Sequence, residues 1–169
     1  MIAIIDSGGA NIASVQFALE RLGAKSVLTQ DVSVIQSADK VLLPGVGAAP
    51  VAMQSLIESG LIDCIRGLTQ PVMGICLGMQ LLFARSPEGN TPLLGIFDAD
   101  CETFTPSHGR SVPHMGWNRL STRQDHPLMA GVEEGAHVYF VHSYFAPVTA
   151  QTVAATSYGD DFTAIVAEN

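Results

Sequence analysis

The segment GICLG at residues 74–78 places Cys76 between two glycines, at the junction of an apolar run and a helical pattern. A sharp turn between a strand and a helix commonly presents a nucleophile, and flanking glycines remove side chains that would clash there. In that setting the thiolate of Cys76 attacks a carbonyl carbon, and the backbone N–H of Leu77 stabilises the oxyanion that forms. A small buried cysteine in a glycine-rich turn explains the same five residues, so this pattern alone leaves both interpretations open.

A second glycine-bearing segment, PGVG at residues 44–47, also follows an apolar run. Small residues after a strand expose backbone N–H groups, which is what an oxyanion hole requires, although an ordinary turn has the same composition. We expect the two preceding strands to be neighbours, so that both segments reach one carbonyl group. The remaining cysteines, Cys64 and Cys101, lack such a setting and are predicted to be packing residues.

The first half of the chain alternates short apolar runs with helical patterns. The runs predict strands near residues 1–6, 26–29, 40–47 and 70–75, and the patterns predict helices near residues 12–23, 51–60 and 77–84. This alternation predicts an α/β fold with a doubly wound, mostly parallel sheet and flanking helices. After about Arg85, turns and short β-like runs predict added antiparallel strands and loops that cover one end of the sheet. Without a linker or repeat, residues 1–169 are predicted to form a single domain.

Composition narrows the classes of function. Hydrophobic residues make up 47% of the chain and charged residues 14%, so either a sheet is buried on both faces or a partner covers part of the surface. A net charge of −8 argues against binding to nucleic acid or to an anionic membrane. The sequence lacks an apolar run of roughly 20 residues and a secretory signal, and its odd number of cysteines does not suggest disulfides. We therefore expect a cytoplasmic location.

Several separated motifs together resemble one known family. LLPGVG and GICLGMQLL resemble the class I, or triad-type, glutamine amidotransferases. DSGGANIASVQFAL, VPHMGWN and YFVHSY narrow the resemblance to the glutaminase subunits of imidazole glycerol phosphate synthases, from histidine biosynthesis. The resemblance covers essentially the whole chain, and it implies a class I amidotransferase fold and glutamine as the substrate.

The resemblance also implies roles for individual residues. Cys76 attacks the side-chain amide carbon of glutamine, ammonia leaves, and water hydrolyses the glutamyl thioester. The N–H groups of Leu77 and Val46 form the oxyanion hole. The positions implied to hold the substrate are Gly45, Gly47, Gln80, Ser143 and Tyr144. No metal or cofactor is implied.

A partner subunit follows from the same resemblance. Ammonia passes to a separate (β/α)₈-barrel synthase subunit, which makes imidazole glycerol phosphate and an aminoimidazole carboxamide ribotide, so the assembly is a heterodimer. The residues implied to face that partner are Asn11, Trp117 and Tyr139. Trp117 is the only tryptophan and lies in a polar, turn-rich context, where aromatic side chains often mark an interface. A half-buried packing role remains the alternative for Trp117.

The sequence departs from the family at the activating base. In the family, the triad histidine and glutamate come from a late FHPE-type motif, whereas this chain ends DDFTAIVAEN, in which TAIVA resembles the strand just before that motif. His142 is the best remaining candidate for the base, because VHSY should approach the substrate pocket, and Glu168 is a poor orienting group. We therefore expect a C-terminally truncated glutaminase subunit without the triad His and Glu, which hydrolyses glutamine slowly or not at all.

Three alternatives stay open. An amidotransferase subunit of another biosynthetic synthase is disfavoured by Met79 and by VPHMGWN. A non-catalytic binding or regulatory subunit is favoured by the missing triad residues. A cysteine hydrolase of the same sheet architecture also lacks a visible base and does not explain PHMGWN.

Overall fold

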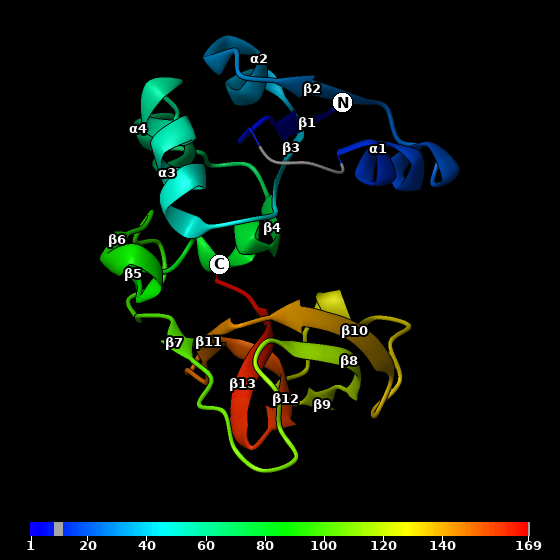
Figure 1. Cartoon of the computed structure of the whole chain (residues 1–169). Coiled ribbons are helices and arrows are strands. Elements are labelled where there is room, and N and C mark those ends of the chain that lie inside the picture. Colours follow the sequence, from blue (N-terminus) through cyan, green and yellow to red (C-terminus); the bar gives the residue numbers. More distant parts are fainter. Residues whose placement is uncertain (9–11, 169) are drawn as a thin grey trace. The chain divides into compact units, whose positions relative to one another are not determined.

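The computed structural model describes residues 1–8 and 12–168, and the chain divides into two compact units, Met1–Asp98 and Ala99–Asn169 (Figure 1). Each unit has its own sheet and its own buried side chains. Whether the two units together form the single domain predicted for residues 1–169 depends on how they associate, so the single domain stays a prediction. No helix in the described part of the chain is long and apolar enough to cross a membrane.

A four-stranded parallel sheet forms the centre of the first unit. Its strands are β1 (Ile2–Ile5), β2 (Ser26–Thr29), β3 (Lys40–Gly45) and β4 (Val72–Cys76). They lie in the order β2-β1-β3-β4, so the chain first adds β2 on one side of β1 and then returns to add β3 and β4 on the other. This reversal makes a doubly wound sheet, and it confirms the predicted α/β class.

Helices connect these strands. They are α1 (Ile12–Arg21), α2 (Val32–Ser37), α3 (Ala49–Glu58), α4 (Ile62–Arg66) and α5 (Leu77–Gln80). Helix α1 ends at Arg21, slightly before the predicted end at residue 23, and Gly23 takes a left-handed conformation (φ +71°) just after it. Leu22 lies beyond the helix and is 81% exposed.

Two of these helices, α2 and α4, were not predicted. A capping signal for α2 was nevertheless present in the sequence. The Asp31 carboxylate accepts hydrogen bonds from the backbone N–H groups of Ser33 and Val34, as an N-cap does.

Helix α5 is shorter than the predicted helix over residues 77–84. The backbone carbonyls of Leu81 and Leu82 accept hydrogen bonds from residues 94–97 instead of from a continuing helix. Leu81, Leu82 and Phe83 are buried, so tertiary packing overrides the local helical pattern. A small hairpin follows, formed by β5 (Arg85–Ser86) and β6 (Thr91–Pro92) around the 3₁₀ turn η1 (Glu88–Asn90).

Antiparallel strands form the second unit, as predicted. They are β7 (Glu102–Thr103), β8 (His114–Arg119), β9 (Ser121–Thr122), β10 (His137–His142), β11 (Tyr144–Pro147), β12 (Thr152–Tyr158) and β13 (Asp160–Val166). Five of them pair in the order β7-β11-β13-β12-β9, and β8 pairs with β10 in a separate ribbon. The described residues of this unit include a 3₁₀ turn, η2 (Pro127–Met129), but no α-helix.

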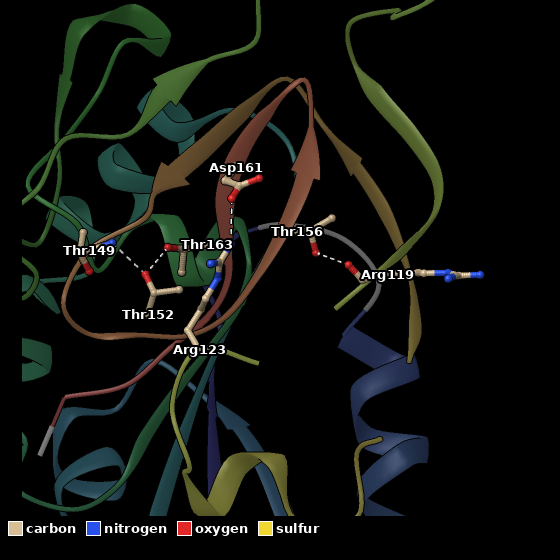
Figure 2. Close-up of polar contacts among 7 residues, drawn as sticks. All are labelled: Arg119, Arg123, Thr149, Thr152, Thr156, Asp161 and Thr163. Carbon is tan, nitrogen blue, oxygen red and sulfur yellow. Dashed lines mark hydrogen bonds and ion pairs between the residues drawn. The ribbon is translucent and has the colours of Figure 1, made fainter. Parts of the chain in front are cut away.

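Polar contacts hold the strands of the second unit together (Figure 2). The hydroxyls of Thr152 and Thr163, both buried, lie 2.6 Å apart across β12 and β13, and the backbone N–H of Thr149 donates to Thr152 Oγ1. Thr156 Oγ1 donates to the carbonyl of Arg119 at 3.1 Å and so ties β12 to the end of β8. Because each of these buried hydroxyls has a hydrogen-bond partner, it helps to fix the relative position of the strands at no cost from an unpaired polar atom.

Candidate active site

Cys76 is the last residue of β4, and α5 begins at the next residue. Its backbone has φ +56° and ψ −119°, a conformation that a residue with a side chain rarely adopts. Such strain is concentrated at functional sites, where the surrounding structure holds it in place. The Cys76 side chain is exposed, whereas Cys64 and Cys101 are buried. The interpretation of Cys76 as a small buried residue is therefore wrong, and the packing role of the other two cysteines is confirmed.

The glycines beside Cys76 have a steric role. A Cβ atom on Gly74 would lie 2.6 Å from the carbonyl oxygen of Gly78, and a Cβ atom on Gly78 would lie 1.7 Å from the carbonyl oxygen of Leu43. A Cβ atom on Gly45 would lie 2.7 Å from the Gly78 nitrogen. The turn therefore packs its backbone directly against β3, and only glycine permits this approach.

The PGVG segment, residues 44–47, begins level with the cysteine. In the parallel pairing of β3 with β4, Gly45 is the register partner of Cys76. Gly47 has φ +89°, and Val46 and Gly47 are exposed after the end of β3. The strands that lead to the two segments are neighbours, as expected, so both segments lie at the carboxyl edge of one sheet. The oxyanion-hole roles of Val46 and Leu77 stay predictions.

The other implied substrate residues belong to different parts of the chain. Gln80 ends α5 and is half-buried. Ser143 joins β10 to β11 in the second unit, and its carbonyl accepts a hydrogen bond from the Phe104 backbone N–H at 3.1 Å. Tyr144 begins β11 and pairs with Thr103. Their contact with glutamine stays a prediction.

One face of the β8–β10 ribbon is apolar and exposed. It consists of Met115, Trp117, Tyr139 and Val141, which we call the ribbon face. The rings of Trp117 and Tyr139 lie opposite one another, 5.6 Å apart and edge to face. Trp117 is 70% exposed, so a half-buried packing role is wrong for it. Asn11, the third residue implied to face the partner, lies outside the described residues.

Met115 and Val141 were missed by the sequence reasoning. Their signal was the alternation of M-x-W in residues 115–117 and of Y-x-V in residues 139–141. In a strand, residues two apart point to the same face.

All five histidines lie in the second unit, and residues 1–98 contain none. His142 uses both ring nitrogens in hydrogen bonds: Nδ1 to the carbonyl of Tyr144 at 2.9 Å, and Nε2 to His114 Nδ1 at 3.2 Å. Burial lowers the pKa of His142, although the hydrogen bond to Tyr144 opposes that shift. Burial, and the positive charge that His142 can carry, also lower the pKa of His114. To act as a base toward Cys76, His142 must give up one of these bonds.

Residues 3–169 match the family described as Glutamine amidotransferase class-I. The chain belongs to this family. This amidotransferase is 52% identical over 165 residues to the "Imidazole glycerol phosphate synthase subunit HisH" of Xanthomonas axonopodis pv. citri (strain 306), an alignment that covers 98% of this chain and 82% of that relative. It is 48% identical over 161 residues to the subunit of the same name from Mannheimia succiniciproducens, covering 95% of this chain and 82% of the relative.

A solved structure named "Crystal structure of glutamine amidotransferase" resembles this amidotransferase with a TM-score of 0.69. The match covers 94% of this chain and 85% of that one at 17% identity, so it supports the fold alone. Together with the sheet order of the first unit, it confirms the predicted class I amidotransferase fold.

Thiol accessibility gives a first prediction for this amidotransferase. We expect iodoacetamide to modify Cys76 alone in the native protein, because burial raises the pKa of the Cys64 thiol and raises that of Cys101 to about 12. Mass spectrometry of tryptic peptides should find all three cysteines modified after denaturation in urea. In the Cys76→Ala variant, native labelling should vanish. Native labelling at Cys64 would contradict the packing described for the first unit.

Proposed function

We propose that this chain is the glutaminase subunit of an imidazole glycerol phosphate synthase, and that it hydrolyses glutamine to glutamate and ammonia for histidine biosynthesis. The observation that carries the proposal is the exposed, strained Cys76, level with the PGVG loop at the carboxyl edge of the sheet. The two relatives described above support the choice of synthase, since their names specify this subunit and the alignments cover 82% of their length.

The proposed chemistry starts with the attack of the Cys76 sulfur on the side-chain amide carbon of glutamine. The oxygen of the tetrahedral intermediate accepts hydrogen bonds from the N–H groups of Leu77 and Val46. The C–N bond then breaks, and the nitrogen leaves as ammonia with the proton that the Cys76 thiol gave up on attack. Water then adds its hydroxyl to the acyl carbon and returns its proton to the sulfur, which yields glutamate and the free thiol. We do not assign the proton transfer to His142, because both of its ring nitrogens are already engaged.

The residues assigned to substrate binding are Gly45, Gly47, Gln80, Ser143 and Tyr144. The backbone around Gly47, Ser143 and Tyr144 holds the α-amino and α-carboxylate groups of glutamine. Gln80, four residues after the nucleophile, lies near the bound glutamine. These assignments follow from the family resemblance of these positions.

The proposed partner is a (β/α)₈-barrel synthase subunit, bound at the ribbon face and at Asn11. Ammonia released into water would be protonated and diluted, so a glutaminase that feeds a synthase needs a closed interface. The ribbon face offers aromatic anchors of the kind that dominate protein interfaces. An amino-acid biosynthetic role places the complex in the cytoplasm.

A chloroketone analogue of glutamine tests the proposed function. The Cys76 thiolate displaces chloride from the analogue and forms a thioether, which peptide mass spectrometry locates. We expect the labelling rate of Cys76 to saturate with analogue concentration, and glutamine to compete with the analogue. The Cys76→Ala variant should remain unlabelled. A rate that rises linearly with concentration and ignores glutamine would show an exposed thiol without a glutamine site, as the non-catalytic alternative requires.

A further inference from the structure

The inner face of the β8–β10 ribbon, opposite the ribbon face, carries polar side chains in an otherwise aromatic environment. His114 is only 3% exposed, and its ring stacks on Tyr158, with ring centres 3.9 Å apart. His142 is the cross-strand partner of His114. Burying the His114 imidazole and half-burying that of His142 costs free energy unless their nitrogens find partners, so their hydrogen bonds decide how this face is arranged.

A series of linked hydrogen bonds, which we call the relay, runs along this inner face. Asn118 Nδ2 lies 3.4 Å from His114 Nε2, His114 Nδ1 lies 3.2 Å from His142 Nε2, and His142 Nδ1 lies 2.9 Å from the Tyr144 carbonyl. It therefore starts on β8, crosses to β10 and ends on the first residue of β11.

The donor and acceptor roles are fixed at both ends of the relay. The amide of Asn118 has one orientation, because its Oδ1 accepts from the Arg119 N–H at 2.8 Å and its Nδ2 donates to the Ser157 carbonyl at 2.9 Å. At the other end, the Tyr144 carbonyl can only accept. The donors must therefore all point the same way, from Asn118 to His114, to His142 and to Tyr144.

This direction fixes both tautomers. Each imidazole has to be neutral, with its proton on Nδ1 and its lone pair on Nε2. A proton added to either ring places two donors face to face at one link and breaks it.

We propose that Asn118, His114 and His142 are positioning residues that hold the Tyr144 carbonyl, and with it the Ser143–Tyr144 segment, in the orientation that binds the amino-acid end of glutamine. This inference rests on the proposed function, because it takes that segment as the substrate site. Trp117 of the ribbon face lies on the same strand, β8, as His114 and Asn118. The strand proposed to meet the partner therefore also orients the substrate segment.

The side chains packed against the two imidazoles leave the relay few competing partners. In the described part of the chain, the rings in contact with them are Phe104, Phe140, Tyr158 and Phe162. The Tyr158 hydroxyl donates to the Ser111 carbonyl rather than to either histidine, and the phenylalanine rings carry no polar atom. These rings therefore do not compete for the imidazole nitrogens.

The first test reads the tautomers directly in the unsubstituted protein. Long-range nitrogen–proton correlation spectra of the imidazole rings should show the proton on Nδ1 for both His114 and His142 above about pH 7. An Nε2 proton on either ring would overturn the relay. This measurement does not depend on the glutaminase proposal.

The second test uses chloroketone labelling of Cys76. His142→Leu, which removes the donor to Tyr144, should raise the half-saturating concentration of the analogue roughly tenfold and leave the maximal rate unchanged. His142→Asn, whose amide N–H replaces Nδ1–H, should restore half-saturation to within about threefold of the unsubstituted protein. His108→Leu, the same substitution at an exposed histidine, should change neither parameter.

The pH profile separates positioning from a merely structural role. Half-saturation of the unsubstituted protein should rise as the pH falls from about 7 to about 5, whereas that of His142→Asn should stay flat. Equal half-saturation in His142→Leu and the unsubstituted protein, or equal losses in the Leu and Asn variants, would overturn the positioning role. If the unsubstituted protein shows no saturable, glutamine-competed labelling, the proposed function fails, while the tautomer measurement still decides the relay.

Discussion

Replacing Gly78 by alanine destabilises the first unit by about 4 kcal/mol or more, a loss that few single substitutions produce. The new Cβ atom would lie 1.7 Å from the Leu43 carbonyl oxygen and 3.1 Å from the Pro44 carbonyl carbon, and both atoms belong to the backbone of β3. A flexible side chain could move aside, but a paired strand in the middle of a sheet cannot. Either β3 shifts and disturbs its pairing with β4, or the turn after Cys76 opens.

The matched control is Gly23→Ala. Gly23 has φ +71° with no atom within 4 Å of the added Cβ, so alanine there meets only the conformational cost, about 1–2 kcal/mol. Pulsed alkylation of the buried Cys64 across a urea titration reports unfolding of the first unit in both variants. Equal urea midpoints of unfolding for the two variants would show that the turn after Cys76 does not pack against β3 as described.

Much of the first unit was predictable from sequence because its apolar runs, helical patterns and turn residues indicate the same strands and helices. The strand predicted over residues 26–29 is β2 with the same bounds, and the strand predicted over residues 40–47 is β3, Lys40–Gly45. Helix α5 was predicted too long, because the carbonyls of Leu81 and Leu82, which follow it, accept hydrogen bonds from residues 94–97, and no local pattern reveals such tertiary hydrogen bonds. Helix α2 was missed although Asp31 gave a capping signal, since six residues show too little periodicity to be recognised.

In the candidate site, too, local features were predictable and features that depend on strand pairing were not. The tight turn at Cys76 and its flanking glycines were predictable, because the steric need for them arises within five consecutive residues. Exposure excludes the buried interpretation of Cys76 and the half-buried interpretation of Trp117, while their functional roles stay predictions. The relay through His114 and His142 was not predictable, because it depends on the register between β8 and β10 and on the orientation of one amide. The role of His142 as a base stays a prediction, and the structure adds that both of its ring nitrogens already take part in hydrogen bonds.

Replacing Trp117 by alanine weakens binding of the proposed barrel subunit by at least about 30-fold, as expected for an aromatic hot spot. Trp117 is the most exposed side chain of the ribbon face, and its edge-to-face contact with Tyr139 orients the ring before any partner arrives. A side chain ordered in advance loses little entropy on binding, so its buried area is retained as affinity. The free protein should keep its stability within about 0.5 kcal/mol, because the ring is exposed.

Val148→Ala is the matched control for this substitution. Val148 is an exposed apolar residue of the same unit that does not belong to the ribbon face, so its removal should leave the dissociation constant unchanged. Isothermal titration calorimetry with the purified synthase subunit measures both variants, and Trp117→Phe should fall between them because phenylalanine keeps part of the apolar area. Unchanged affinity for Trp117→Ala, with the unsubstituted chain binding tightly, would place the interface elsewhere. A 30-fold loss of affinity in Trp117→Ala, with no loss in Val148→Ala, would instead place the synthase on the ribbon face of β8. The opposite face of the same strand then orients Tyr144.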